Sequence, residues 1–170
     1  PDFIGFGNYI KLFTKDKEFW TSLRVTIVFA LMTVPGKIIL ALAVAIFLNR
    51  DIRGINLIRT LYYIPSLFGG SVAIAILWKL MFLDNGPINA VLTALRLPNV
   101  QFLGSTTWAL PTICLLEIWQ FGSSMVMFLA ALKNVPKSLY EAAEIDGAGK
   151  AKRFWHITLP QISPIIFFLS

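Results

Sequence analysis

The feature that most constrains this chain is the run Val25–Leu48, which is nearly all apolar. About 20 consecutive apolar residues make a helix long enough to cross the hydrocarbon core of a bilayer. The composition agrees, because 56% of the residues are hydrophobic and 14% are charged, against roughly 25% charged in an average soluble domain. The sequence therefore predicts an integral membrane protein in which residues 25–48 form a transmembrane helix.

Two further apolar runs, 61–83 and 108–132, predict two more transmembrane helices, and a fourth run begins at 164. We expect residues 1–170 to be a single transmembrane domain, an all-α polytopic helical bundle. The first residue is not Met, and the run 164–170 is too short to cross a bilayer. We therefore expect a fragment that lacks both ends of its subunit.

The distribution of basic residues predicts the orientation in the membrane. Segments 49–59 and 133–160 hold three and five Lys or Arg residues, eight in all. The segments on the other side hold five, or six when Lys79 is counted with them. Short loops rich in Lys and Arg mark the cytoplasmic face, so we expect both segments there. Segment 6–23 mixes aromatic and Lys residues, which predicts an amphipathic helix at the outer interface, in contact with membrane lipid.

Several chemistries are excluded. The two Gly-Lys pairs are followed by Ile38 and Ala151 and not by Ser or Thr, so no Walker A loop is present and we expect no ATP hydrolysis by this chain. His156 and Cys114 are the only residues of their types, and no cluster has the spacing of metal ligands. We therefore predict no catalytic residue, no metal and no cofactor in this chain. The net charge of +6 does not indicate nucleic acid, because the basic residues lie at the ends of apolar runs.

The cytoplasmic segment 133–160 predicts two short helices. Ser138 followed by Glu141 reads as a capping box that opens the first helix, which we expect to end near Asp146. Gly147 then supplies a left-handed residue, and a second helix follows over 150–160, which Pro160 and Pro164 close. The result is a helix-turn-helix at the membrane surface.

This segment resembles the EAA loop of bacterial binding-protein-dependent ABC importers, in which it contains the helix that couples to a cytoplasmic ATPase. The matching residues are Glu141-Ala142-Ala143, Asp146-Gly147-Ala148, Phe154, Ile157, Leu159-Pro160 and Pro164. The resemblance implies that the ATPase-coupling residues are Glu141, Ala142, Ala143, Asp146, Gly147, Ala148 and Phe154. Three alternatives stay open: Glu141 completes a capping box, Gly147 serves the turn alone, and Phe154 anchors the loop to the bilayer.

The rest of the chain resembles the carbohydrate branch of these permeases, the maltose, lactose and glycerol-phosphate type. The matching strings are Phe6-Gly7-Asn8-Tyr9, Arg53-Gly54, Ile64-Pro65 and Ile118-Trp119-Gln120. The resemblance implies a type I importer fold in a bacterial inner membrane, working by alternating access. It also implies four kinds of component around the chain: an ABC ATPase dimer that uses ATP and magnesium, a second permease subunit, an extracytoplasmic solute-binding protein and a sugar or related polar solute.

Ionisable residues at membrane depth are costly and mark functional positions. Lys37 and Glu117 fall near the centres of their predicted helices, so we hypothesise that they pair across two helices. Glu117, Gln120, Phe121 and Ser124 have the spacing of one helical face. With Trp119 and Lys37 they form the candidate substrate path, since sugars offer hydroxyls to polar groups and a ring face to aromatic ones. The alternative is that these side chains pack and hydrogen-bond between helices.

Other functions would leave different marks. A secondary transporter without an ATPase partner would also be polytopic, but it should show inverted repeats and ion-coupling carboxylates near the midplane. Glu117 is one such carboxylate, and the sequence shows no repeat. Another polytopic membrane enzyme or scaffold would need a catalytic cluster, which this sequence lacks. An importer permease is therefore the favoured interpretation.

Overall fold

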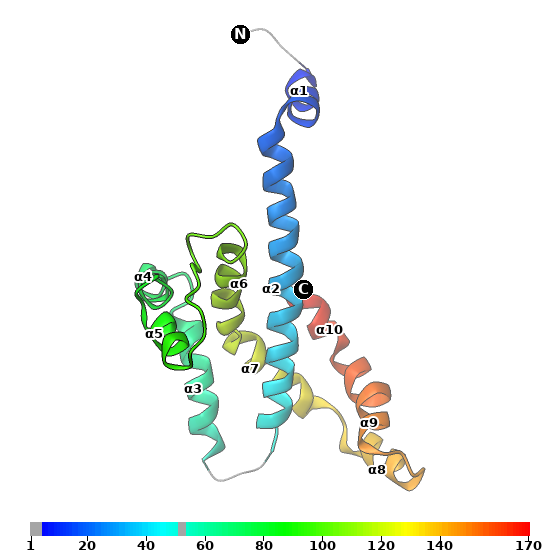
Figure 1. The fold of residues 1–170 in the computed structure, drawn as a ribbon. Coiled ribbons are helices and arrows are strands. Elements are labelled where there is room, and N and C mark those ends of the chain that lie inside the picture. The colour runs from blue at the N-terminus through cyan, green and yellow to red at the C-terminus, as the bar shows by residue number, and fades with distance from the viewer. Residues whose placement is uncertain (1–4, 51–53) are drawn as a thin grey trace.

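The computed structural model describes residues 5–50 and 54–170, and every regular element within those ranges is a helix (Figure 1). The long helix α2 stands at the centre. Helix α3 rises beside it from the end at which α2 finishes, α6 returns toward that end, and α8 lies there too. Helix α1 lies at the opposite end. The predicted all-α class is confirmed, and the described parts of the two basic connections, 49–50 with 54–59 and 133–160, share one end of the molecule. Arg53 lies outside the described residues.

Helix α2 (Lys17–Leu48) begins earlier than the predicted 25–48. Asp16 caps it by accepting hydrogen bonds from the N–H groups of Glu18 at 2.9 Å and Phe19 at 3.1 Å. The predicted interfacial segment 6–23 is therefore divided between α1 (Gly7–Lys15) and the first turns of α2. Among the described helices, α2 alone is long and apolar enough to cross a membrane by itself.

The predicted helix 61–83 is two helices, α3 (Ile55–Leu67) and α4 (Val72–Met81), with 99° between them. The chain turns at Gly70, which has a left-handed φ of +77°. Helix α3 also starts before residue 61, directly after Gly54, and Arg59 ties it to the end of α2 by donating to the carbonyl oxygen of Leu48 at 2.6 Å. A pattern of apolar residues does not reveal such a contact.

The predicted helix 108–132 is likewise two helices, α6 (Ala109–Trp119) and α7 (Gly122–Asn134), bent by 45°. Each bent pair is apolar and long enough to span a membrane only when its two helices are taken together. A helix that the sequence did not predict, α5 (Pro87–Ala94), lies between α4 and α6. Buried Asn89 fixes it by exchanging two hydrogen bonds, both 2.9 Å, with the backbone of Val100.

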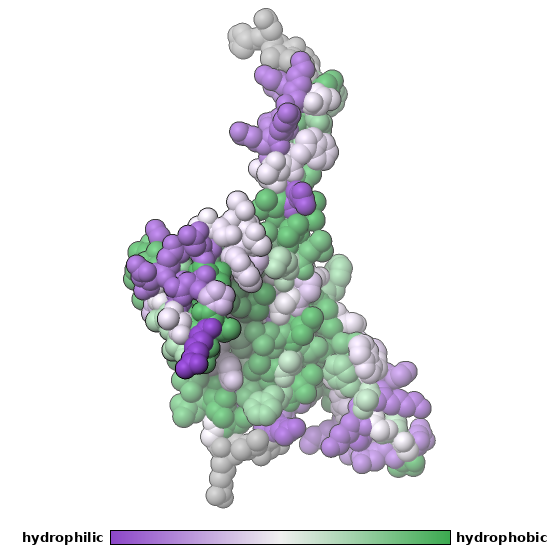
Figure 2. Space-filling model, viewed as in Figure 1, coloured by the Kyte–Doolittle hydropathy of each residue, from purple (hydrophilic) through white to green (hydrophobic). Residues whose placement is uncertain are grey.

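The core lies where α2, α7 and α10 (Leu159–Leu169) meet. Small Ala41 and Ala45 of α2 are fully buried and face the larger side chains of the other helices, among them Met125, Phe128 and Ile162. Many large apolar side chains outside this core are exposed, and Figure 2 shows them covering the middle of the molecule, while hydrophilic residues gather around α1, around α8 and on the side where α4 and α5 lie. This distribution is typical of a chain surrounded by lipid and by other subunits.

Candidate functional site

Helix α8 (Lys137–Ile145) ends in a Schellman motif. The N–H of Gly147 donates to the carbonyl of Glu144 at 3.0 Å, and the N–H of Ala148 donates to the carbonyl of Ala143 at 2.8 Å. Gly147 has a φ of +72°, with no atom within 4 Å of the place where a Cβ would be. The predicted left-handed turn is therefore confirmed, and backbone conformation, not space, requires glycine there.

The predicted capping box is wrong. Helix α8 starts at Lys137 with Pro136 as its N-cap residue, and no side chain caps it. The helix begins directly after Pro136, which has a φ of −59° and whose carbonyl accepts from the N–H of Leu139 at 3.2 Å. Ser138 and Glu141 consequently lie inside the helix. The Glu141 side chain is exposed and forms no hydrogen bond or ion pair with another described residue. Capping of α8 therefore does not explain why a glutamate stands at this position.

The inner face of α8 is fastened to the helix that follows. The hydroxyls of Tyr140 and Thr158 lie 2.8 Å apart, and Arg153 donates to the Glu144 carboxylate at 3.1 Å. Half-buried Ala143 and Ala148 line a small cavity of about 220 Å³ on this side, together with exposed Asp146 and four residues of the next helix, Lys152, Arg153, His156 and Ile157. These contacts hold α8 in a fixed position.

The outer face of α8 carries Glu141, Ala142 and Ile145, all exposed. Ile145 is 88% exposed, although it is large and apolar. We call these three residues the α8 outer face. The structure thus divides the predicted coupling residues between this face and the fastened side, and it adds Ile145. Its spacing of four residues from Glu141 could have identified it.

The second helix of the loop does not end at Pro160 as predicted. Helix α9 (Lys150–Arg153), the π-helical turn η1 (Phe154–Thr158) and α10 follow one another without a break. In η1 the Leu159 N–H bonds to the carbonyl of Phe154, five residues back, which widens the helix just before the Pro160 ring. Pro164 leaves the carbonyl of Pro160 without its helical donor, and the Ser163 hydroxyl donates to it at 2.7 Å. Helix α8 is therefore joined through Thr158 and Arg153 to a continuous helix.

Phe154 is half-buried and packs edge-to-face on Trp155, at 5.6 Å between ring centroids, while Trp155 itself is exposed.

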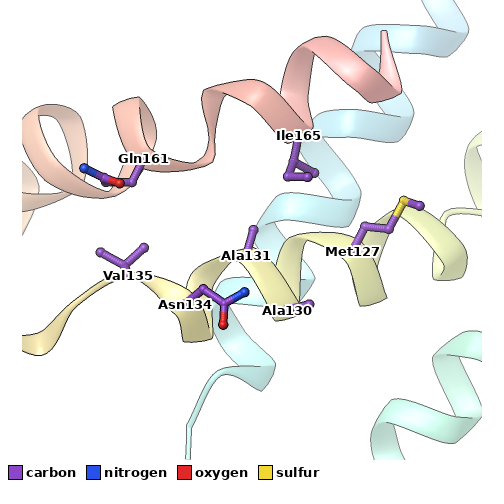
Figure 3. Close-up of a pocket in the computed structure, with 7 residues that line it drawn as sticks. All are labelled: Met127, Ala130, Ala131, Asn134, Val135, Gln161 and Ile165. Carbon is purple, nitrogen blue, oxygen red and sulfur yellow. The ribbon is translucent and has the colours of Figure 1, made fainter.

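A groove of about 380 Å³ lies between α7 and α10 (Figure 3). Figure 3 shows Gln161 and Ile165 of α10 facing Ala131 and Val135 across this groove. Small Ala130 and Ala131 lie in the wall of this groove beside larger residues, so a gap remains along one side of the contact between α7 and α10, while Ile162 on another side of α10 is fully buried in the core.

The predicted substrate stripe does not form one helical face, because the chain bends between Trp119 and Gly122. Three of its residues, Gln120, Phe121 and Ser124, are buried, whereas Glu117 and Trp119 remain partly exposed. The predicted proximity of Lys37 and Glu117 is confirmed: Nζ and Oε2 lie 3.9 Å apart, with side chains 30% and 43% exposed. That distance is longer than a hydrogen bond, so the pair is loose.

Ser66 of α3, a residue that the sequence did not single out, holds the bend. Its hydroxyl donates to the carbonyl of Gln120 and accepts from the N–H of Ser123, both at 3.1 Å. A break in a helix leaves carbonyl groups before it and N–H groups after it without helical partners. The Ser66 hydroxyl supplies a partner to one group of each kind. Gly122 lets α7 approach α3, since a Cβ there would lie 2.5 Å from the carbonyl oxygen of Tyr62. No local pattern could reveal a partner that lies more than fifty residues away.

A second cavity, of about 470 Å³, opens between α3 and this bend. Its lining is mostly aromatic and apolar: Ile58, Leu61, Tyr62, Pro65, Trp119 and Phe121. Tyr62 packs against Phe121 at 5.8 Å and Trp78 against Trp119 at 5.9 Å between ring centroids. The bend therefore brings two residues of the predicted substrate path, Trp119 and Phe121, to the wall of an open, mostly aromatic and apolar cavity.

Known proteins resemble this chain along nearly its whole length. The probable ABC transporter permease protein YesP of Bacillus subtilis is 47% identical over 169 residues, which cover 99% of this chain and 55% of YesP. The lactose transport system permease protein LacF of Rhizobium radiobacter is 36% identical over 172 residues, covering 99% of this chain and 57% of LacF. The chain therefore spans little more than half the length of these relatives.

The fold is similar to that of a bacterial ABC transporter involved in the import of the acidic polysaccharide alginate. The TM-score is 0.82 at 28% identity, over 98% of this chain and 59% of the solved one. Residues 14–170 match the family described as binding-protein-dependent transport system inner membrane component. This chain belongs to that family of ABC importer membrane components.

Proposed function

We propose that this chain is part of the membrane-spanning subunit of an ATP-driven importer, and that the α8 outer face docks on a separate ATPase. The observation that carries the proposal is the highly exposed Ile145, on a helix whose opposite side is fastened to α9 and η1, which continue into α10. A large apolar side chain held out from a rigid helix is suited to a pocket on another protein. ATP and magnesium would then bind in the ATPase and not in this chain.

Movement of the ATPase would pass through α8 into α10. Tyr140–Thr158 and Glu144–Arg153 carry the displacement, and the groove between α7 and α10 leaves α10 room to tilt. In the alternating-access mechanism that we propose, closure of an ATPase dimer switches the bundle between inward and outward openings. ATP and solute must then favour different conformations, because a ligand that binds both equally shifts neither.

We propose a sugar or related polar solute as the substrate. The proposal is supported by similarity to a lactose permease and to an importer of an acidic polysaccharide. The path would pass the bend between α6 and α7, where Glu117 and Trp119 are partly exposed and Glu117 is loosely paired with Lys37. Buried Gln120, Phe121 and Ser124 would shape its wall. A second permease subunit would complete the path, and an extracytoplasmic binding protein would deliver the solute.

The test is Ile145→Asp in the full-length subunit, expressed with its ATPase and its other partners. We expect membrane insertion to persist and co-purification of the ATPase to fall at least tenfold, because a charge would enter an apolar pocket. The matched control is Leu139→Asp, which alters an exposed apolar residue on another side of the same helix. Retained ATPase association and retained uptake in Ile145→Asp would overturn the proposal and favour a transporter without an ATPase partner.

A further inference from the structure

Helix α1 lies at the end of the molecule opposite to α8, and one of its sides is apolar and mostly exposed, although Phe13 on that side packs on α2. Phe6, Tyr9, Ile10 and Phe13 recur at the spacing of one helical face. They are 79%, 61%, 61% and 51% exposed. We call these four residues the α1 apolar stripe. Four large apolar side chains in a row indicate a surface that is covered in the working protein.

The opposite side of α1 is basic. Asn8, Lys11 and Lys15 share the face across the helix from the stripe, and Lys17 follows at the start of α2. All three Lys residues line a hollow of about 480 Å³ in the elbow between the two helices, together with Asn8, Leu12 and two carboxylates, Asp16 and Glu18. Asp16 accepts hydrogen bonds from the first N–H groups of α2, so the three lysines outnumber the acidic groups left free there. Figure 2 shows this division, with hydrophilic residues along one side of α1 and apolar ones along the other. An aromatic stripe opposite a lysine face is the pattern of a helix that lies in a membrane interface.

Local contacts fix the angle of the elbow. The Phe13 ring packs edge-to-face on Phe19 at 5.2 Å and on Trp20 at 6.1 Å. The indole N–H of Trp20 also donates to the carbonyl of Phe13 at 3.0 Å. Since Phe19 and Trp20 follow the elbow along α2 toward its apolar part, the end of the stripe at Phe13 faces the membrane side of the elbow.

The depth of the elbow agrees with a position among lipid headgroups. The apolar part of α2 begins at Val25, and Lys17 lies eight residues before it. At about 1.5 Å per residue, Lys17 lies at most about 12 Å beyond the hydrocarbon edge, and less when α2 is tilted. Aromatic residues between these points, Phe19 and Trp20, are the types that gather at headgroup level.

We propose that α1 lies on the outer leaflet, with its apolar stripe inserted between lipid headgroups and its lysines bound to the phosphates of anionic phospholipids. The occupant that the structure favours is lipid, because the exposed stripe, the opposed basic face and the interfacial aromatic residues occur together at headgroup depth. A protein partner covering the stripe would not need lysines at the elbow.

The experiment uses the full-length subunit with its partners in nanodiscs, in a background whose other cysteines are replaced. A fluorophore is attached at Tyr9→Cys on the stripe or, as the matched position, at Asn8→Cys on the basic face. Brominated lipid tails should quench the label at position 9 strongly and the label at position 8 weakly. Equal quenching at both positions, or none at position 9, overturns the proposal. The proposal is also overturned if lipid quenches the label at position 9 in the subunit alone and a protein partner, once added, removes that quenching.

The lysines are tested separately with spin-labelled lipids. The double variant Lys11→Gln and Lys15→Gln should lower the enrichment of phosphatidylglycerol over phosphatidylcholine about fivefold for each lysine removed. The charge-conserving variant Lys11→Arg and Lys15→Arg should keep the enrichment. Unchanged enrichment in the Gln variant excludes the headgroup contact, and this outcome is independent of whether an ATPase docks on α8.

Discussion

The α8–α10 region and the bend between α6 and α7 both redirect the chain, but different contacts hold them. Partners nine and eighteen residues apart, Glu144–Arg153 and Tyr140–Thr158, fasten α8. Ser66 holds the bend from 54 and 57 residues away. The first region exposes its outer face, whereas the second buries Gln120 and Phe121. The difference indicates that α8 is a locally built unit that presents a surface, while the bend exists only when the bundle is packed.

The largest expected effect is at the bend. Gly122→Val would place side-chain atoms against the backbone of Tyr62 and Tyr63, and we expect it to lower the free energy of unfolding by about 3 kcal/mol. Thermal unfolding of the purified subunit in detergent measures this. Gly104→Val is the control, since a Cβ there meets nothing closer than 3.9 Å. Equal melting temperatures in the two variants would show that α7 does not approach α3 closely.

Ser66→Ala should have the next largest effect. It leaves the Gln120 carbonyl and the Ser123 N–H without their partner, which should cost about 2 kcal/mol of folding stability. Thr60→Ala is the matched control, because the Thr60 hydroxyl bonds only within its own helix, to the carbonyl of Asn56. A Ser66 variant as stable as the Thr60 variant would mean that the bend does not need the contact from α3.

Gly147→Ala should act on α8 alone. Alanine at a φ of +72° costs about 1–2 kcal/mol locally, which would loosen the end of α8 without disturbing the bundle. We expect reduced stimulation of the partner ATPase by solute, with membrane insertion and melting temperature little changed. Gly149→Ala, at a φ of −65° in open space, should behave as the unaltered protein. A large loss of insertion in Gly147→Ala would contradict the local character of this unit.

The smallest effect on stability is expected for the loose pair Lys37–Glu117. Loss of this pair should change the free energy of unfolding by at most about 1 kcal/mol, because both side chains are partly exposed. Lys37→Glu or Glu117→Lys alone should reduce solute uptake, and the double reversal should restore it. Uptake is compared at equal expression. If the double variant is as impaired as the single ones, the proximity of these residues has no functional meaning.

The sequence predicted what depends on neighbouring residues. Gly147 was predicted to be left-handed because helices commonly end in that way, and it is. The proximity of Lys37 and Glu117 is an exception, since these residues lie on different helices and only their similar depths in the predicted helices indicated it. The capping box at Ser138 was a wrong prediction even though it is local. Pro136 and Ser138 both suit a helix start, and the structure uses the proline.

The bend between α6 and α7 could not be derived in the same way, whereas the Gly69-Gly70 pair is a local turn signal for the break between α3 and α4. Neither Gln120 nor Phe121 breaks a helix by its own propensity, and their bend depends on Ser66 and on the fit of Gly122 against α3. Pro160 gave the opposite error, since a proline predicts an end and here the π turn lets the helix continue. Contacts between segments distant in sequence, and small adjustments of helical geometry, carry no local signal.

Cross-linking from the α8 outer face tests the central claim most directly. A photoreactive residue at position 145 of the full-length subunit, in membranes with all partners present, should cross-link to the ATPase. The same residue at position 139, on another side of α8, should do so at least tenfold less. Cross-linking that is equal at the two positions, or absent from position 145 while ATP-dependent uptake continues, would contradict the account.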